Sequence, residues 1–248
     1  EHFGSSTSLM GLSVGVYLGT SAIFQILVGP LSDRIGRRTV SLWALIIFSV
    51  VSISCVYAPN TFVFMVLRAL QAIAACTFVV ARAIVRDTTE TQASGSKIAY
   101  ISMGTAICPM FGPALGGLLD GWFGWEANFW FIGGLGIFIL LIAYFDLGET
   151  VPENTQGFRQ QFSEYPELLL SRRFWGYCLA SAFGAGAFFA YLGGGPFVGS
   201  IVYNLSPEML GLYFGAPAIG YFFGNFLSGR FTILFGIDAM ILWGLWII

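Results

Sequence analysis

Charged residues are scarce in this chain. Lys, Arg, Asp and Glu together make up 10% of its 248 residues, and 56% of the residues are hydrophobic. About 25% of the residues of a soluble domain are charged, so lipid must cover most of the outside of this protein. The composition therefore predicts a polytopic membrane protein with an all-α fold.

Histidine and lysine are almost absent. The only histidine is His2, and the only lysine, Lys97, lies at the edge of an apolar run. A retinal Schiff base needs a lysine within a span, and an embedded hydrolase or metal centre needs polar ligands there. We therefore expect no enzyme activity, no metal site and no cofactor, while a ligand receptor stays open as an alternative.

The basic residues form no stripe with interleaved aromatics, and the net charge is −2. Nucleic-acid binding is therefore not expected. All four cysteines lie in apolar runs, at Cys55, Cys76, Cys108 and Cys178. They are expected to pack as small side chains and not to form disulfides.

Seven apolar runs are long enough to cross a membrane, which takes about 20 residues. They lie near residues 8–29, 40–58, 61–84, 96–118, 127–146, 174–199 and 208–228, and an incomplete eighth begins near 237. Lys and Arg gather in the loops after the first, third, fifth and seventh runs, and the opposite loops have none. By the positive-inside rule the first set is cytoplasmic, so the chain starts outside.

The longest connection, residues 148–173, is polar, and its middle is expected to form a short surface helix. Such a segment resembles the linker between two halves of a transporter. An internal repeat supports this, because Leu-Ser-Asp-Arg at 31–34 recurs as Leu-Ser-Gly-Arg at 227–230. We expect an N-terminal half at 1–147, a cytoplasmic linker at 148–173 and the start of a C-terminal half at 174–248.

The stretch 29–38, Gly-Pro-Leu-Ser-Asp-Arg-Ile-Gly-Arg-Arg, places opposite charges together between two apolar runs. Its Pro and Gly are expected to break the helix there. Asp33 can accept hydrogen bonds from backbone amides at a helix start, or pair with Arg37 or with Arg82 and Arg86. Such a cluster can latch one conformation, and the alternative is that the arginines only set the topology.

Six positions of this stretch resemble the loop motif of the major facilitator superfamily of secondary transporters. That motif reads Gly-x-x-x-Asp-Arg-x-Gly-Arg-Arg/Lys. The resemblance implies that the runs correspond to the second to eighth of twelve spans, with the chain ending inside the ninth and lacking the first. The expected latch comprises Gly29, Asp33, Arg34, Gly36, Arg37, Arg38, Arg82, Arg86 and Asp87.

The third run places Arg68 and Gln71 one turn apart, about 10 Å deep in hydrocarbon. An intramembrane arginine indicates a functional site. The pair resembles the Arg-x-x-Gln-Gly of the drug antiporters of the superfamily, with Ala72 in place of the glycine. Arg68 is expected to tune the pKa of a nearby carboxylate or to hold a water chain during proton transfer. The alternative is a structural arginine that caps the carbonyls of a broken helix.

The fourth run carries small residues at intervals of four. Such a stripe permits close helix approach, and it resembles the antiporter motif Gly-x-x-x-Gly-Pro-x-x-Gly-Gly. The resemblance implies drug:proton antiport, and a uniporter or symporter for a sugar or metabolite is the alternative. The residues of this set are Gly104, Cys108, Gly112, Pro113, Gly116 and Gly117.

The sixth run is expected to break before its outer end, at a Gly-Gly-Gly-Pro stretch after several aromatics. A broken, aromatic helix can line a cavity for flat hydrophobic substrates, although aromatics also face lipid. The segment 190–198 resembles the bicyclomycin and chloramphenicol resistance branch of the drug antiporters. The candidate cavity residues are Phe188, Phe189, Tyr191, Gly195 and Pro196.

No Asp or Glu lies deep within any of the seven runs. A proton-coupled carrier needs a titratable group in the membrane, which we expect in a span outside this sequence. The resemblance implies a monomeric multidrug exporter in the bacterial cytoplasmic membrane, driven by the proton gradient. Its partners would be the lipid bilayer, protons and a small hydrophobic or amphipathic substrate.

Overall fold

The computed structural model describes residues 7–105, 107–151, 166–205 and 207–247 of the chain. Within these ranges it contains helices and no β-strand, so the predicted all-α fold is confirmed. The α-helices are Thr7–Ile35 (α1), Arg37–Val56 (α2), Thr61–Gln71 (α3), Ala75–Thr88 (α4), Thr91–Thr105 (α5), Ile107–Phe123 (α6), Glu126–Asp146 (α7), Arg172–Phe197 (α9), Pro207–Phe235 (α10) and Ile237–Ile247 (α11). A 3₁₀ turn, Ala72–Ala74 (η1), joins α3 to α4, and a π-helix, Val198–Val202 (η2), follows α9.

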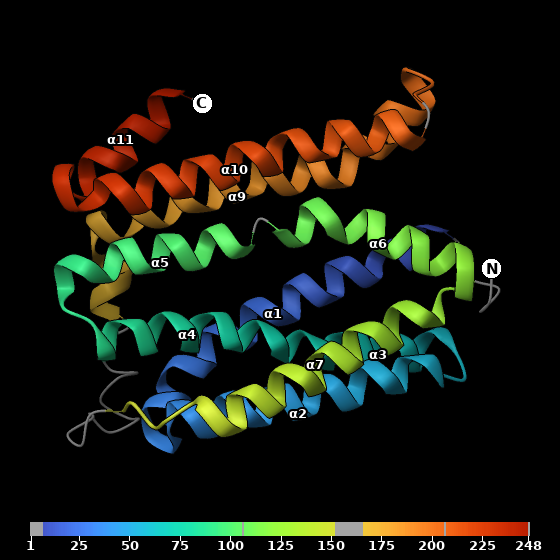
Figure 1. Ribbon diagram of the computed structural model, residues 1–248, viewed down its shortest axis with the longest axis horizontal. Helices are drawn as coiled ribbons and strands as arrows, with labels where there is room; N and C mark the ends of the chain where they lie inside the picture. The colour runs from blue at the N-terminus through green and yellow to red at the C-terminus, as the bar shows by residue number, and fades with distance from the viewer. Residues whose placement is uncertain (1–6, 106, 152–165, 206, 248) are drawn as a thin grey trace. The chain divides into compact units, whose positions relative to one another are not determined.

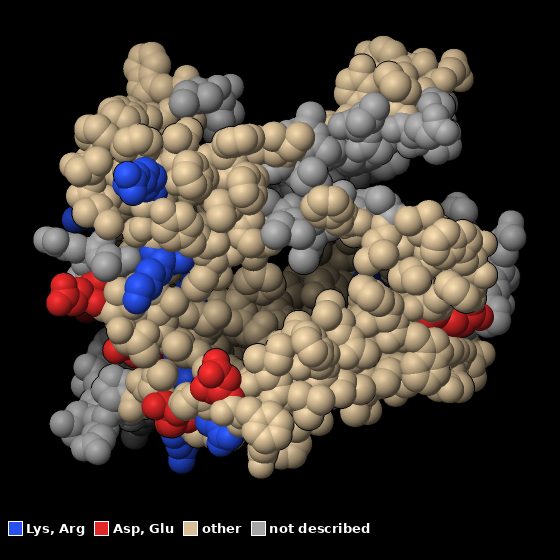
Figure 2. Space-filling view, viewed as in Figure 1, with Lys and Arg blue, Asp and Glu red and all other residues tan. Residues whose placement is uncertain are grey.

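The predicted apolar runs correspond to these helices. Among the described residues, the segments long and apolar enough to cross a membrane are Leu12–Ile35, Arg37–Val56, Thr61–Thr88 and Glu126–Asp146. In Figure 2 most of the visible charged side chains lie near the ends of helices, and the flanks between are uncharged. Part of the predicted linker, residues 166–170, is helical, and its middle lies outside the described residues.

The helix break expected within the stretch 29–38 falls at Gly36 and not at Pro30. Helix α1 continues through Pro30 to Ile35, and the chain turns at Gly36, whose φ is +108°. A proline removes one backbone donor, but it does not reverse the chain within a membrane helix whose neighbours cover it. A positive φ of this size is readily accessible to glycine alone, so Gly36 makes the turn.

The break expected inside the sixth run is also displaced. Helix α9 runs unbroken to Phe197, past the Gly-Gly-Gly-Pro stretch, and the irregular turn η2 comes after it. There Tyr203 N donates to Val198 O over 3.1 Å, and Leu205 N donates to Gly199 O over 2.9 Å. The wider turn keeps backbone groups paired, which a membrane span requires, while the helix ends.

The chain divides into two units of contact. Unit 1 comprises Glu1–Thr89 and Leu118–Phe158, and unit 2 comprises Glu90–Gly117 and Arg159–Ile248. The predicted boundary between two halves at 148–173 is a different division and stays a prediction. In unit 1, α2 packs along α7 and against α3, and α1 packs against α3 and α4 (Figure 1). In unit 2, α5 packs along α10, and α10 turns into α11 at Gly236.

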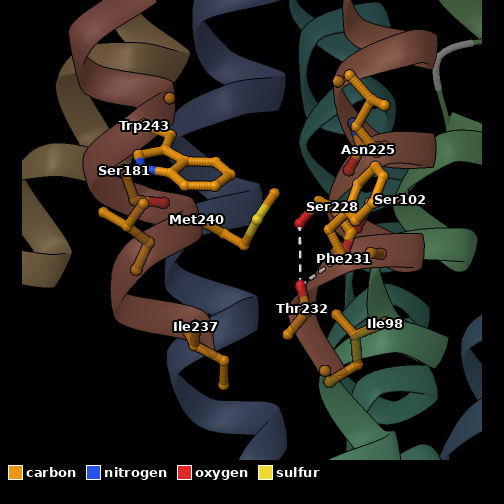
Figure 3. A pocket seen from close by; sticks show the side chains of 16 residues that line it. Ile98, Ser102, Ser181, Asn225, Ser228, Phe231, Thr232, Ile237, Met240 and Trp243 are labelled. Atoms are coloured by element: carbon orange, nitrogen blue, oxygen red, sulfur yellow. Dashed lines mark hydrogen bonds between the residues drawn. The ribbon is translucent and has the colours of Figure 1, made fainter. Parts of the chain in front are cut away.

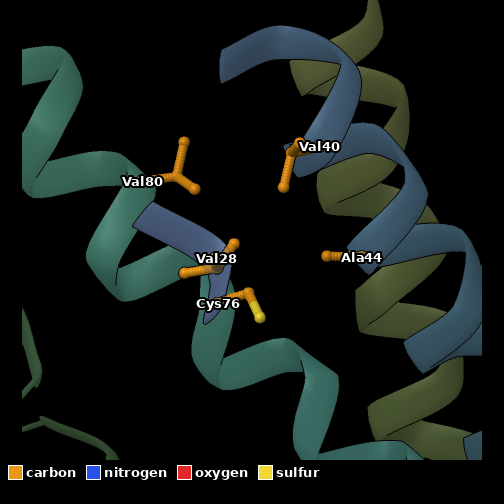
Figure 4. Packing of buried hydrophobic residues seen from close by; sticks show 5 residues of the cluster. All are labelled: Val28, Val40, Ala44, Cys76 and Val80. Carbon is orange, nitrogen blue, oxygen red and sulfur yellow. The ribbon is translucent and has the colours of Figure 1, made fainter. Parts of the chain in front are cut away.

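The interior of unit 1 is built from small and branched side chains. Its cluster contains Val28 from α1, Val40 and Ala44 from α2, and Cys76 and Val80 from α4 (Figure 4). Their side chains are at most 8% exposed. Cys76 thus packs as a small apolar residue, in agreement with the prediction for the cysteines.

The serines of α2 bond to their own helix. The hydroxyls donate to backbone carbonyls four residues earlier, over distances of 2.6–2.8 Å, at Ser41, Ser49, Ser52 and Ser54. Such bonds satisfy the hydroxyl inside an apolar span. Helix α2 can therefore lie in hydrocarbon despite its polar side chains.

Helices α2 and α7 approach closely through two buried glycines. A Cβ on Gly133 would lie 2.8 Å from Cγ1 of Ile53. A Cβ on Gly136 would meet the Ser49 hydroxyl and lie 3.0 Å from Cδ1 of Phe48. Both contacts are tighter than van der Waals packing allows, so the absence of a side chain sets this helix spacing.

We predict that Gly136→Val destabilises the full-length protein, because its side chain must push α7 away from α2. Overpacking costs about 1–3 kcal/mol, which corresponds to a Tm lower by roughly 2–10 °C for a chain of this size. The matched control is Gly134→Val in the same helix, where a Cβ meets nothing within 4 Å. Thermal unfolding in detergent measures both, and equal shifts would contradict the role of Gly136.

Candidate functional site

Arg37 joins the ends of three helices of unit 1, at the side predicted to face the cytoplasm. Its guanidinium forms an ion pair with Asp33 at the end of α1 and donates from Nε to Oδ2 of Asp87, 3.1 Å away, at the end of α4. Its Nη1 also donates to the Ser32 hydroxyl. The Arg37 side chain is 7% exposed, so these carboxylates neutralise a charge that is largely removed from water.

The other predicted latch residues are placed differently. Arg38 donates from Nη2 to Tyr144 O over 2.9 Å and lies over the Tyr144 ring, 5.5 Å from its centroid. Arg34, Arg82 and Arg86 are exposed and take no part in the ion pairs of Arg37. A Cβ on Gly29 would meet nothing within 4 Å. Pairing of Asp33 with Arg37 was one of the expected arrangements, and the latch itself stays a prediction.

Glu149, at the start of the predicted linker, belongs to the same cluster. Its Oε1 accepts hydrogen bonds from Arg37 N at 2.8 Å, Thr150 N at 3.0 Å and Val151 N at 3.3 Å. A Cβ on Gly36 would meet this carboxylate. The negative group thus occupies the N-terminus of α2, where unpaired backbone amides and the helix dipole favour it.

Sequence reasoning missed Glu149 because 112 positions separate it from Arg37. One available signal was Gly36, a motif glycine that leaves room for an approaching group. The other was an acidic residue at the start of the predicted linker, on the same predicted side of the membrane as the start of α2. Together they are consistent with a carboxylate that accepts a hydrogen bond from a backbone amide in the first turn of α2.

We predict that Glu149→Ala lowers the Tm of the full-length protein, because Arg37 N loses its acceptor. The carboxylate is partly exposed, so the loss is about 1 kcal/mol, or a few degrees at roughly 2–4 °C per kcal/mol. Asp146→Ala is the matched control, since Asp146 is an exposed acid of the same segment. A Tm of Glu149→Ala equal to that of the control would refute the capping role.

A second polar cluster lies inside the membrane part of unit 1. Arg68 donates from Nη1 to Oε1 of Gln71, and Gln71 Nε2 donates to the Ser52 hydroxyl over 2.8 Å. Gln71 is 1% exposed and Ser52 is 0% exposed. Cζ of Arg68 also lies 5.2 Å from the centroid of the Tyr17 ring, within the range of a cation–π contact.

These side-chain contacts connect three spans. Tyr17 is in α1, Ser52 is in α2, and Arg68 and Gln71 are in α3. The turn η1 begins directly after Gln71, and Ala72 in it is fully buried. The bond shown for Arg68 goes to a side-chain amide and not to a backbone carbonyl. Among the described residues no carboxylate forms an ion pair with Arg68.

The small-residue motif lies on α5 and α6. A Cβ on Gly104, Gly112 or Gly117 would meet nothing within 4 Å. Gly116 is half-buried. The side chains of Cys108 and Pro113 lie outside the described residues, and the role of the motif stays a prediction.

The candidate cavity of the sixth run is not visible as such. Phe189 and Tyr191 are exposed, and the Tyr191 hydroxyl donates to Tyr213 O on α10. The burial and contacts of Phe188, Gly195 and Pro196 lie outside what the structure describes. Substrate contact by these five residues stays a prediction.

A different hollow lies within unit 2, with a volume of about 780 Å³. It is lined by residues of α5, α9, α10 and α11, among them Ser102, Ser181, Asn225 and Trp243 (Figure 3). Its described lining residues combine hydroxyls and an amide with aromatic and aliphatic side chains, and none of them is charged. Of the described cavity residues expected from the sequence, neither Phe189 nor Tyr191 lines it.

Residues 1–248 match the family model described as Major Facilitator Superfamily. The chain belongs to the major facilitator superfamily. This is a family of transporters and not of enzymes. Together with the long apolar helices of this chain, the family makes the protein a multi-pass integral membrane protein.

Relatives support the assignment. The chain is 33% identical to an uncharacterized MFS-type transporter, YdgK of Bacillus subtilis, over 93% of its own length and 59% of that protein. It is 32% identical to multidrug resistance protein MdtL of Escherichia coli over 68% of its length and 44% of that protein. The chain thus spans about half the length of the curated relatives it matches.

A solved structure shows the same fold. It is a bacterial homologue of the human lysosomal transporter Spinster, with a TM-score of 0.66 and 24% identity. The match covers 93% of this chain and 57% of that one. At this identity the likeness concerns the fold alone.

Proposed function

We propose that this chain belongs to a proton-coupled exporter of small hydrophobic or amphipathic compounds, including antibiotics, in the bicyclomycin and chloramphenicol resistance branch. The similarity to MdtL, which is named for multidrug resistance, supports this substrate class. The antiporter-like glycines of α5 and α6 and the segment 190–198 support the branch. The bacterial relatives support a place in the bacterial cytoplasmic membrane.

The observation that carries the proposal is the hydrogen-bonded network of the Arg68, Gln71 and Ser52 side chains within the span. A guanidinium within a span is energetically costly, and such groups mark ion or substrate pathways. Here Gln71 and Ser52 anchor it to the backbone of α2, because the Ser52 hydroxyl donates to Phe48 O. A cation held in this way can stabilise a carboxylate or a hydrogen-bonded water chain, which proton exchange requires.

Export then follows by alternating access between the halves 1–147 and 174–248, joined by the linker 148–173. Arg37 and Glu149 hold the cytoplasmic ends of α1, α2 and α4 together, so these helices move as one body. The proton gradient supplies the energy, so the monomer needs no cofactor. Its partners are lipid, protons and the substrate.

We predict that the full-length protein in vesicles exports a fluorescent amphipathic cation only while a proton gradient exists. A protonophore should abolish the export, because the downhill proton drives the uphill substrate. Vesicles without the protein give the background. Movement that persists at the same rate after collapse of the gradient would instead favour the sugar- or metabolite-type uniporter mechanism.

We also predict that Arg68→Gln lowers gradient-driven export at least about tenfold, because a charge-assisted hydrogen bond is lost where water cannot replace it. Arg172→Gln is the control, since Arg172 is an exposed arginine to which no role in the latch or the polar cluster is assigned. Both variants should reach the membrane in equal amounts. Export by Arg68→Gln at the level of the control would exclude Arg68 from the pathway.

A further inference from the structure

A groove lies between α1, α2 and the start of α4 in unit 1. Its volume is about 400 Å³. Its floor belongs to the buried cluster described above, since Val28, Val40, Ala44 and Cys76 line it (Figure 4). The groove is therefore built into the packing of three spans and is not a gap between loose side chains.

The sides of the groove are apolar and exposed. Leu27, Leu31 and Ile35 of α1 and Trp43 of α2 line it, and their side chains are between 40% and 60% exposed. Apart from Thr39, the described residues that line the groove are aliphatic, aromatic or sulfur-containing. Such a surface is unfavourable against water, so hydrocarbon is the medium that suits it.

A positive charge lies at one end of this apolar stripe. Arg34 is seven residues past Leu27 on α1, so the two positions are only about 20° apart around the helix. Arg34 is exposed, and among the described residues no carboxylate forms an ion pair with it. Its neighbour Asp33 is engaged by Arg37. Arg34 is therefore available to an anion at the end of the groove, on the side predicted to face the cytoplasm.

The polarity of the groove falls with depth in the membrane. Along α2 it is lined by Thr39, Trp43 and Ile47, each about one turn, or 6 Å, deeper than the last. A hydroxyl comes first, then an indole, which prefers the boundary between head groups and hydrocarbon, and then an aliphatic side chain. A phospholipid has the same order, from phosphate through glycerol esters to acyl chain.

We propose that this groove binds one anionic phospholipid of the cytoplasmic leaflet, with its phosphate against Arg34 and an acyl chain along Leu31 and Trp43. A net negative head group fits better than a zwitterionic one, because Arg38 places a second positive charge nearby and the basic side of a membrane protein attracts anionic lipid. The inference does not depend on the proposed export.

The size of the groove favours a lipid chain over another helix. A helix is about 10–12 Å across with its side chains, so one turn of 5.4 Å fills about 400–600 Å³. The groove would hold about one turn, whereas a membrane span is about 30 Å long. An acyl chain is only as wide as an unbranched side chain, so it can lie in the groove along its length.

The head-group contact is tested by native mass spectrometry of the full-length protein in detergent, titrated with phosphatidylglycerol. We expect one lipid to bind more tightly than the rest. Arg34→Gln should weaken this binding about fivefold, which corresponds to the attraction of one basic residue for anionic lipid. Arg172→Gln is the control, since Arg172 is an exposed arginine that does not line the groove. Equal binding by the two variants would overturn the contact.

The groove is tested by Leu31→Trp, whose larger side chain takes the space of the acyl chain. We expect at least about tenfold weaker binding of the tight phosphatidylglycerol. Ile23→Trp is the matched control, because Ile23 is an exposed residue of the same helix outside the groove. Leu31→Phe replaces Leu31→Trp if the latter fails to fold, with a smaller loss expected.

Two results would overturn the lipid site. Equal binding of phosphatidylglycerol and phosphatidylethanolamine by the unmodified protein would refute the anionic head group. Unchanged lipid binding by Leu31→Trp, together with a Tm below that of Ile23→Trp, would show that a further part of the full-length protein or a second copy fills the groove. Neither measurement uses protons or a transported substrate, so the result stays readable if the export proposal fails.

Discussion

The ion pairs of Arg37 are the interaction that holds together the ends of α1, α2 and α4 in unit 1. The Arg37 guanidinium pairs with Asp33 and Asp87, and the backbone amide of Arg37 donates a hydrogen bond to the Glu149 carboxylate. One residue thus connects α1, α2, α4 and the start of the linker. A buried guanidinium with fewer partners would be strongly destabilising, so both Asp33 and Asp87 are needed where Arg37 is buried.

The turn at Gly36 makes this assembly geometrically accessible. Its positive φ directs α2 away from α1, and the missing side chain leaves space for the Glu149 carboxylate. The glycine of the loop motif therefore has two separate uses in this chain. A substitution there would strain the backbone and displace the acid at the same time.

Much of this architecture could be predicted from the sequence. The apolar helices and the family followed from hydropathy and from the motif at 29–38, because those signals are local. The break expected in the stretch 29–38 occurs at Gly36. Pro30 does not contribute to it, because a covered span tolerates a residue that is a strong local breaker in water. Arg68 and Gln71 were found because polar groups are rare in hydrocarbon.

Contacts between distant residues could not be found in that way. Such contacts depend on which helices pack together, and a single sequence carries little information about that packing. Examples are the hydrogen bonds from Arg37 N to Glu149, from Gln71 to Ser52 and from Ser96 to Gly229 O. Ser52 was the hardest to recognise, since α2 contains several serines and nothing local separates the one that accepts from Gln71. The structure distinguishes them by their neighbours.

The self-bonded serines of α2 have a consequence for how the protein enters the membrane. A hydroxyl that donates to its own helix no longer has to be stripped of water as a free donor when the segment passes from the insertion machinery into lipid. Helix α2 should therefore partition as a more apolar segment than a hydropathy scale assigns to it. Its insertion need not wait for Gln71 of the following span to arrive, and the two spans can meet afterwards within the bilayer.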